Sequence, residues 1–325
     1  MRQFLTTLVV IWTAASLAAY FYSQQQHIPA PILIAVLPAF LVEIAFYLVP
    51  GFASVREAFD RLGSKPLRAA LLALSALVPY LIVSLGTATF TFSSFLILLS
   101  VVLAASFWYA VIPHGIAADL LFLALMAAVY LSKVFDHIYG RPFPHVVLAI
   151  LGQLMWIRLG LLAVLSLRTI EGAGFGFIPA PHEWRIGAQL YLCFLPVGAA
   201  LGYLVRFARF HPQHLAWWKF TLLLTGTFLA FLWVVGLAEE FFFRAFLQQL
   251  LARKAHSEML GLALASFLFG LAHLSFGFFP NWRFAMLGGV AGLFYGIAFL
   301  KARSVRASMV THALVVTTWR MLFAG

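Results

Sequence analysis

Residues 92–112 read FSSFLILLSVVLAASFWYAVI, a run that contains no Asp, Glu, Lys, Arg or His. About 20 apolar residues in a helix are enough to cross the hydrocarbon core of a bilayer. Within hydrocarbon, a backbone must satisfy its own hydrogen bonds, and a single helix does so within one segment. This stretch therefore predicts a membrane-spanning helix.

Similar apolar runs recur from one end of the chain to the other. We therefore expect an all-α protein, a polytopic transmembrane helical bundle with roughly ten or eleven hydrophobic segments. It would be an integral, multi-pass membrane protein, in the cell membrane if its source is bacterial. The other runs are 4–22, 28–49, 67–85, 116–131, 146–167, 187–204, 220–237, 260–274, 284–300 and 305–323.

The composition of the 325 residues supports the same fold class. Apolar residues make up 64% of the chain and charged residues 10%, whereas a soluble domain is ~45–50% apolar and ~25% charged. The formal charge of +11 is spread over loops between apolar runs and does not form one basic face, which excludes a nucleic-acid partner. We expect membrane lipids as partners instead.

The basic loops predict an orientation, because Lys and Arg gather on the cytoplasmic side. Four loops are expected there: the one after the second run, those around Arg209 and Lys254, and the one around Arg303. If every run crossed once, these loops would not all fall on one side. We therefore expect a kinked, re-entrant or paired run, either at residues 113–115 or after Leu237.

The chain shows no internal repeat, and its best boundary is the polar connection at 207–219. Trp217 and Trp218 in this connection suit a headgroup interface. The sequence predicts an N-terminal multi-span region at 1–215 and a second domain at 216–325.

Ionisable residues at membrane depth are the candidates for chemistry, because one charge at a helix centre costs ~2.5–3.5 kcal/mol on insertion scales. Four carboxylates are expected at membrane depth, and two histidines lie inside apolar runs: Glu43, Asp119, Glu239, Glu240, His273 and His312. The last third of the chain thus holds two adjacent glutamates and two histidines from later helices. Such groups can also serve only to tie helices together by hydrogen bonds.

Glu240 and Arg244 are four residues apart, so they share one helix face within pairing distance. Glu239 points about a quarter-turn away on a helix of ~3.6 residues per turn. We therefore expect Glu240 to be neutralised by Arg244 and structural, and Glu239 to be available as a general base. No H-E-x-x-H zinc motif and no G-x-S-x-G elbow occurs. We expect no cofactor, although two His and two Glu leave zinc open.

These residues resemble the motifs of a known family. Glu239-Glu240-x-x-x-Arg244, Phe269-x-x-x-His273 and His312 are similar to the three motifs of the CPBP intramembrane proteases, which include type II CAAX prenyl proteases and Abi-like proteins. The resemblance covers residues 217–325. It implies a glutamate-based and metal-free endopeptidase in which Glu239 activates water, His273 assists and His312 stabilises the oxyanion. Glu240, Arg244 and Phe269 would be supporting residues.

The resemblance implies that the protein hydrolyses a peptide bond of a membrane-anchored peptide or protein. The alternative is a non-catalytic CPBP-like protein that acts in self-immunity or as a maturation or binding partner. A third class is a small-solute transporter that uses Glu43, Asp119 and Arg158, but such transporters are built from repeated halves.

The chain departs from the family in its third motif, where Val316 stands at the position that commonly holds Asn or Asp four residues after the histidine. Thr311, Thr317 or Thr318 would have to supply a hydroxyl donor, or water would. With an incomplete oxyanion hole, His312→Ala should cost less activity than His273→Ala.

Overall fold

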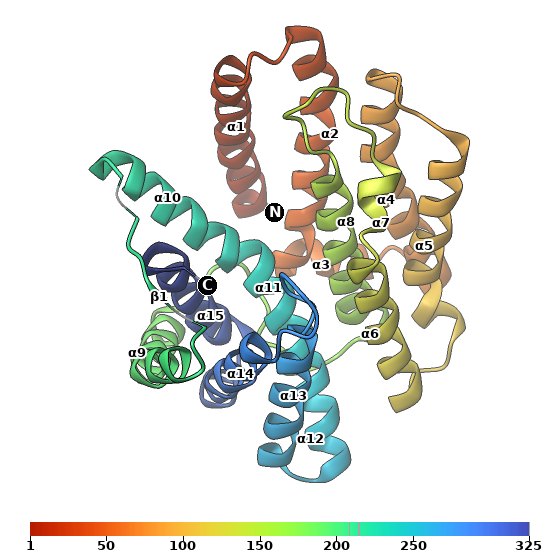
Figure 1. Ribbon diagram of the computed structural model, residues 1–325. Coiled ribbons are helices and arrows are strands. Elements are labelled where there is room, and N and C mark those ends of the chain that lie inside the picture. Colours follow the sequence, from red (N-terminus) through yellow and green to blue (C-terminus); the bar gives the residue numbers. More distant parts are fainter. Residues whose placement is uncertain (208, 214, 325) are drawn as a thin grey trace. The chain divides into compact units, whose positions relative to one another are not determined.

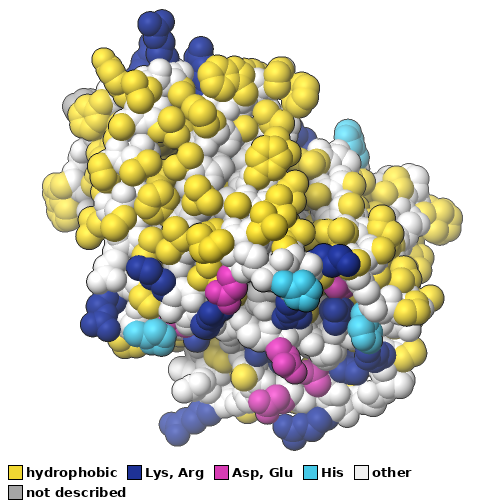
Figure 2. All heavy atoms as spheres, turned by 90° about the horizontal axis from the view of Figure 1, so that it is seen from below, with side chains coloured by type: hydrophobic (Ala, Val, Ile, Leu, Met, Phe, Trp, Pro, Cys, Tyr) yellow, Lys and Arg dark blue, Asp and Glu magenta, His cyan; other side chains and the backbone are white. Residues whose placement is uncertain are grey.

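The computed structural model describes residues 1–207, 209–213 and 215–324, and the described part is helical apart from two short strands. This confirms the predicted helical class. β1 (Arg209–Phe210) pairs antiparallel with β2 (Phe323–Ala324). Eight helical stretches are long and apolar enough to cross a membrane. The protein is a multi-pass integral membrane protein, and Figure 2 shows apolar side chains over much of one face, with charged and histidine side chains gathered in separate patches.

The chain divides into two compact units, residues 1–170 and 171–325. The first unit contains ten helical elements, of which Figure 1 labels the eight α-helices: α1 (Arg2–Gln25), α2 (Ala30–Leu48), η1 (Val49–Gly51), α3 (Ala53–Asp60), α4 (Lys65–Gly86), α5 (Phe92–Val111), α6 (Ile116–Leu131), α7 (Val134–Ile138), α8 (Ala149–Leu162) and the π-helical η2 (Ala163–Arg168).

The first unit packs around α8 and η2, where 72% of the best apolar window is buried. Arg158 on this central helix donates from Nε and Nη2 to the two carboxylate oxygens of Glu43, at 3.0 and 3.2 Å, and from Nη1 to Ser75 at 2.7 Å. Arg168 pairs with the buried Asp119 at 2.9 Å. The charged groups that a transporter would use are therefore paired within this unit.

The second unit contains α9 (Pro181–Leu204), α10 (Trp217–Ala230), the π-helical η3 (Phe231–Val235), α11 (Gly236–Glu240), the π-helical η4 (Phe241–Gln248), α12 (Gln249–Ala255), α13 (Glu258–Ala272), α14 (Trp282–Ala302) and α15 (Val305–Leu322). α9 packs against α14 and α15, so it belongs to this packing unit. A packing unit is defined by contacts and not by function, so the functional boundary predicted between residues 215 and 216 stays a prediction.

Polar side chains cap the N-termini of several of these helices. Ser257, Asn281 and Ser304 each accept a hydrogen bond from a backbone N–H in the first turn of the helix that follows, α13, α14 or α15. Such capping satisfies a donor that has no partner inside the helix. The starts of the three helices that carry or surround the site are thereby fixed.

Residues 217–255 form one continuous helical stretch of 39 residues, from α10 to α12, and Figure 1 shows that it changes direction near α11. At ~1.5 Å per residue the stretch is roughly 58 Å long, whereas the hydrocarbon core is ~30 Å thick. Lys219 and Lys254 lie near opposite ends of this stretch. The expectation that the loops at both ends are cytoplasmic, and that the run after Leu237 is kinked, re-entrant or paired, stays a prediction.

Candidate active site

The glutamate pair lies at the end of α11, between the π-helical stretches η3 and η4. π-helical turns are rare and often occur at functional sites. Gly236 begins α11, and a methyl group in its place would lie 2.6 Å from the carbonyl oxygen of Phe231 and 3.7 Å from the ring of His312. A small residue is therefore needed where the backbone and the histidine ring approach each other.

Glu240 is completely buried and is held from two sides. Arg244 Nε donates to Oε2 at 3.1 Å, which is the ion pair predicted from the i,i+4 spacing. His312 Nδ1 lies 2.8 Å from Oε1. Because a carboxylate paired with arginine only accepts hydrogen bonds, Nδ1 of His312 carries the proton and donates. Glu240 thus fixes both the orientation and the tautomer of His312.

Glu239 occupies a different environment from its neighbour. Its side chain is 32% exposed, and Oε2 lies 3.9 Å from Nε2 of His312. This oxygen is buried and finds no hydrogen-bonding partner among the residues that the structure describes. Because the other nitrogen of His312 donates to Glu240, Nε2 is the nitrogen directed toward Glu239. The two glutamates therefore contact opposite sides of one imidazole.

Aromatic rings surround His312 and Arg244. The ring of Tyr295 stacks on His312 with centroids 4.6 Å apart and an interplanar angle of 12°. Phe269 packs edge-on to His312 at 6.0 Å, and the guanidinium carbon of Arg244 lies 4.9 Å from its ring centroid. Phe269 therefore contacts both His312 and Arg244, and its supporting role stays a prediction. Only the packing of α14 reveals Tyr295, because no spacing in the sequence links it to the motifs.

His273 lies just after α13 and contacts a different set of groups. Its Nδ1 is 2.7 Å from the carbonyl oxygen of Phe269, so Nδ1 donates to this oxygen. Its ring packs against Phe269 and Phe284 at 4.6 and 5.0 Å. Within the described residues, the ion pair of Glu239 is made with His312, and none joins Glu239 to His273. The predicted assistance of His273 stays a prediction.

The third motif contains three threonines that were candidates for the missing oxyanion donor. Thr311 donates to the carbonyl oxygen of Gly187 at 3.0 Å, and Thr318 pairs with Tyr191 at 2.7 Å, so both hydroxyls are bound to α9. Thr317 is buried, and its hydroxyl has no partner in the described part of the chain. At ~100° per residue, however, it lies roughly 140° around the helix from His312, away from the site.

Among the described residues, no group of three or more His, Cys, Asp or Glu side chains is arranged to hold a metal ion. Glu239, Glu240 and His312 are close together, but Glu240 and His312 hydrogen-bond to each other. The site that the side chains do form is an acid–base site: a partly exposed carboxylate, an oriented imidazole and a buried Glu–Arg pair.

The chain was also compared with known proteins. Residues 219–318 match the family model described as type II CAAX prenyl endopeptidase Rce1-like. We call this part of the chain the Rce1-like segment. In the other two comparisons, no curated protein and no solved structure matched the chain. The Rce1-like segment begins in α10 and ends in α15, so it contains the glutamates, both histidines and Tyr295.

Proposed function

We propose that the Rce1-like segment is an intramembrane endopeptidase that hydrolyses a peptide bond of a membrane-anchored substrate with a water activated by Glu239. The observation that supports this most strongly is the buried, unpartnered Oε2 of Glu239, defined within the described residues and facing Nε2 of His312. A carboxylate in this position can accept a proton from water held between it and the imidazole. No covalent enzyme intermediate is involved.

In the proposed reaction, water attacks the carbonyl carbon of the scissile bond while Glu239 takes one of its protons. The carbonyl oxygen becomes an oxyanion, which His312 Nε2 stabilises when this nitrogen is protonated. The protonated Glu239 then gives its proton to the leaving amide nitrogen, the C–N bond breaks, and the products are a carboxylate and an amine. Glu240 and Arg244 hold His312 in position throughout.

The family description points to CAAX peptides as one class of substrate. We propose a peptide tail that is anchored in the bilayer, with a prenylated CAAX peptide as the first probe and an unprenylated lipid-anchored peptide as the second. The chain would receive either peptide from the membrane that its helices span.

The test is cleavage of both peptides by purified protein in lipid nanodiscs, in water enriched in ¹⁸O. Wild type should place one ¹⁸O atom in the new carboxylate. Glu239→Gln keeps the shape but removes the proton acceptor, so the rate should fall by the ~10²–10⁴ typical of general-base loss. Glu57→Gln is the matched control, because Glu57 pairs with Arg61 at the surface of the first unit. Equal cleavage by wild type and Glu239→Gln would contradict the proposal and favour a non-catalytic partner.

A further inference from the structure

A seam of buried polar groups runs along one face of α14, next to the proposed catalytic residues. Gly292 and Gly296 are four residues apart and share this face. A methyl group on Gly292 would lie 3.2 Å from Nη2 of Arg244 and 3.3 Å from Cα of Ser266. One on Gly296 would lie closest to Cδ1 of Leu262 and 2.6 Å from Oε1 of Gln248. The two glycines leave room for polar side chains that η4 and α13 direct at α14. We call this region the glycine seam.

Several polar side-chain atoms of the glycine seam are buried and have no hydrogen-bonding partner among the described residues. Arg244, Gln248 and Ser266 are 0%, 1% and 2% exposed. Both Nη atoms of Arg244, Oε1 of Gln248 and Oγ of Ser266 have no hydrogen-bonding partner among the described residues. An unsatisfied buried polar group costs about 1–3 kcal/mol. Four such atoms in one seam would be a large destabilisation, so they need a ligand.

The chemistry of these atoms identifies that ligand. Arg244 offers only donors, Oε1 of Gln248 only accepts, and the Ser266 hydroxyl does either. Arg244 Nη2 and Ser266 Cα lie 3.2 and 3.3 Å from the position that a methyl group on Gly292 would occupy. These two atoms are therefore at most 6.5 Å apart. Donors and acceptors that are this close without touching are bridged by a small molecule that both donates and accepts. Water has this property, and a buried water typically makes about three hydrogen bonds.

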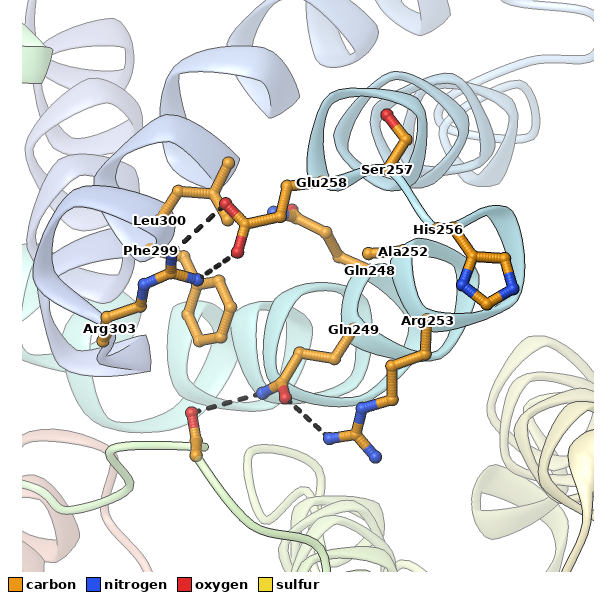
Figure 3. Close-up of a pocket in the computed structure, with 11 residues that line it drawn as sticks. Gln248, Gln249, Ala252, Arg253, His256, Ser257, Glu258, Phe299, Leu300 and Arg303 are labelled. Atoms are coloured by element: carbon orange, nitrogen blue, oxygen red, sulfur yellow. Dashed lines mark hydrogen bonds and ion pairs between the residues drawn. The ribbon is translucent and has the colours of Figure 1, made fainter.

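The glycine seam connects two places. At one end, Gln248 lines a pocket of about 350 Å³ with polar side chains that include Arg253, His256 and Ser257, and Figure 3 shows this pocket between α12, α13 and the end of α14. At the other end, Arg244 binds Glu240, which binds His312, which faces Glu239. Gln248 and Arg244, four residues apart on one helical stretch, therefore lie between the pocket and the proposed catalytic carboxylate.

We propose that the glycine seam holds a file of ordered water and supplies water from the polar pocket to the proposed catalytic centre. Each hydrolysed bond consumes one water molecule, and the bilayer core around the helices contains none to donate. Gln248 is then a positioning residue that controls access of water, and Arg244 orders the file besides holding Glu240. The catalytic use of this water rests on the proposed function, whereas its presence does not.

The presence of water is tested by X-ray hydroxyl-radical footprinting of the wild-type protein in nanodiscs, because radicals form from bound water and oxidise adjacent side chains. Phe269 borders the seam beneath Arg244 and is 2% exposed. Phe241 is equally buried but packs against Phe175 and Phe242, so it is the matched control. We expect oxidation of Phe269 and protection of Phe241. Equal protection of both rings would overturn the proposal.

Substitution then tests the route. Gln248→Leu keeps the side-chain size but removes the acceptor, so Phe269 oxidation should be lost and kcat should fall with KM unchanged. Gln153→Leu makes the same change at an exposed position of α8 in the first unit, so it should leave both readouts as in wild type. If Gln248→Leu keeps wild-type kcat while Phe269 becomes protected, the supply route is overturned.

A second pair of variants covers the case that Gln248→Leu fails to fold. Gly292→Ala puts a methyl group into the seam, whereas Gly289→Ala puts one on the same helix at ordinary contact distance, 3.6 Å from the carbonyl oxygen of Ser266. Only Gly292→Ala should protect Phe269. Equal effects of both would contradict the water file. Phe269 oxidation without any peptide cleavage would support the file and overturn the proposed function, so the two failures are distinguishable.

Discussion

At the scale of single residues, the two glutamates differ because of their contacts and not because of their chemistry. Glu240 is bound by Arg244 and His312, whereas Glu239 has one side-chain oxygen without a partner among the described residues. Adjacent positions on a helix point in different directions, so one glutamate can be a structural anchor while the other faces the reaction. The ring between them, His312, connects the two.

This arrangement changes the expected order of the histidine variants. The resemblance alone predicts that His312→Ala is the milder change. His312 contacts both glutamates, however, while His273 contacts the Phe269 backbone and aromatic rings. We therefore expect His312→Ala to lower kcat by the ~10²–10³ of a lost oxyanion donor and His273→Ala to lower it less. Cleavage rates of both variants, compared at equal folded concentration by thermal melting, check this order. A larger loss with His273→Ala would restore the role implied by the family.

At the scale of elements, the helical stretch of residues 217–255 positions the proposed site. η3 and η4 change the winding of the helix on both sides of the glutamates. The same stretch carries Glu239 and the pocket residue Gln248, so the proposed chemistry and the proposed water access share one stretch.

The helical stretch of residues 217–255 predicts on which side of the membrane each of its ends lies. We expect a stretch of roughly 58 Å to cross a ~30 Å hydrocarbon core once. Reporter fusions at Arg209 and Lys254 should therefore report opposite sides of the membrane. Arg303 should report the same side as Lys254, because Arg303 pairs with Glu258 at the start of α13, next to the end of α12. If the reporters at Arg209 and Lys254 report the same side, the stretch bends back within the bilayer.

At the scale of the whole molecule, each compact unit has its own buried charge network. In the first unit Arg158 and Glu43 are 1% and 0% exposed, and in the second Arg244 and Glu240 are fully buried. Breaking a buried pair leaves one charge without compensation, which is far more costly than breaking a pair at the surface. These networks therefore hold the helices of each unit in one arrangement.

Arg158→Met leaves Glu43 buried without its partner, so the free energy of unfolding should fall by about 3–5 kcal/mol. Arg61→Met is the matched control, since Arg61 and Glu57 form a pair that is 77% and 64% exposed, and its effect should stay within about 1 kcal/mol. Thermal melting and denaturant titration of both variants in detergent provide the measurement. Near-equal stability would mean that water or another group compensates Glu43 in the first unit.

The sequence by itself determined the features that are local along the chain. Apolar runs of sufficient length require helices in a membrane, and the i,i+4 spacing of Glu240 and Arg244 brings them together on one helix. The motif order likewise indicated the family that matches residues 219–318.

Only the tertiary structure decided how side chains from different helices meet. It pairs His312 with Glu240, stacks Tyr295 on His312, ties Thr311 and Thr318 to α9 and directs Arg244 and Gln248 at the glycines of α14. The rotation of each helix about its axis and the distance between helices set these contacts, and both depend on packing around the entire helix. Spacing within one segment carries no information about either quantity.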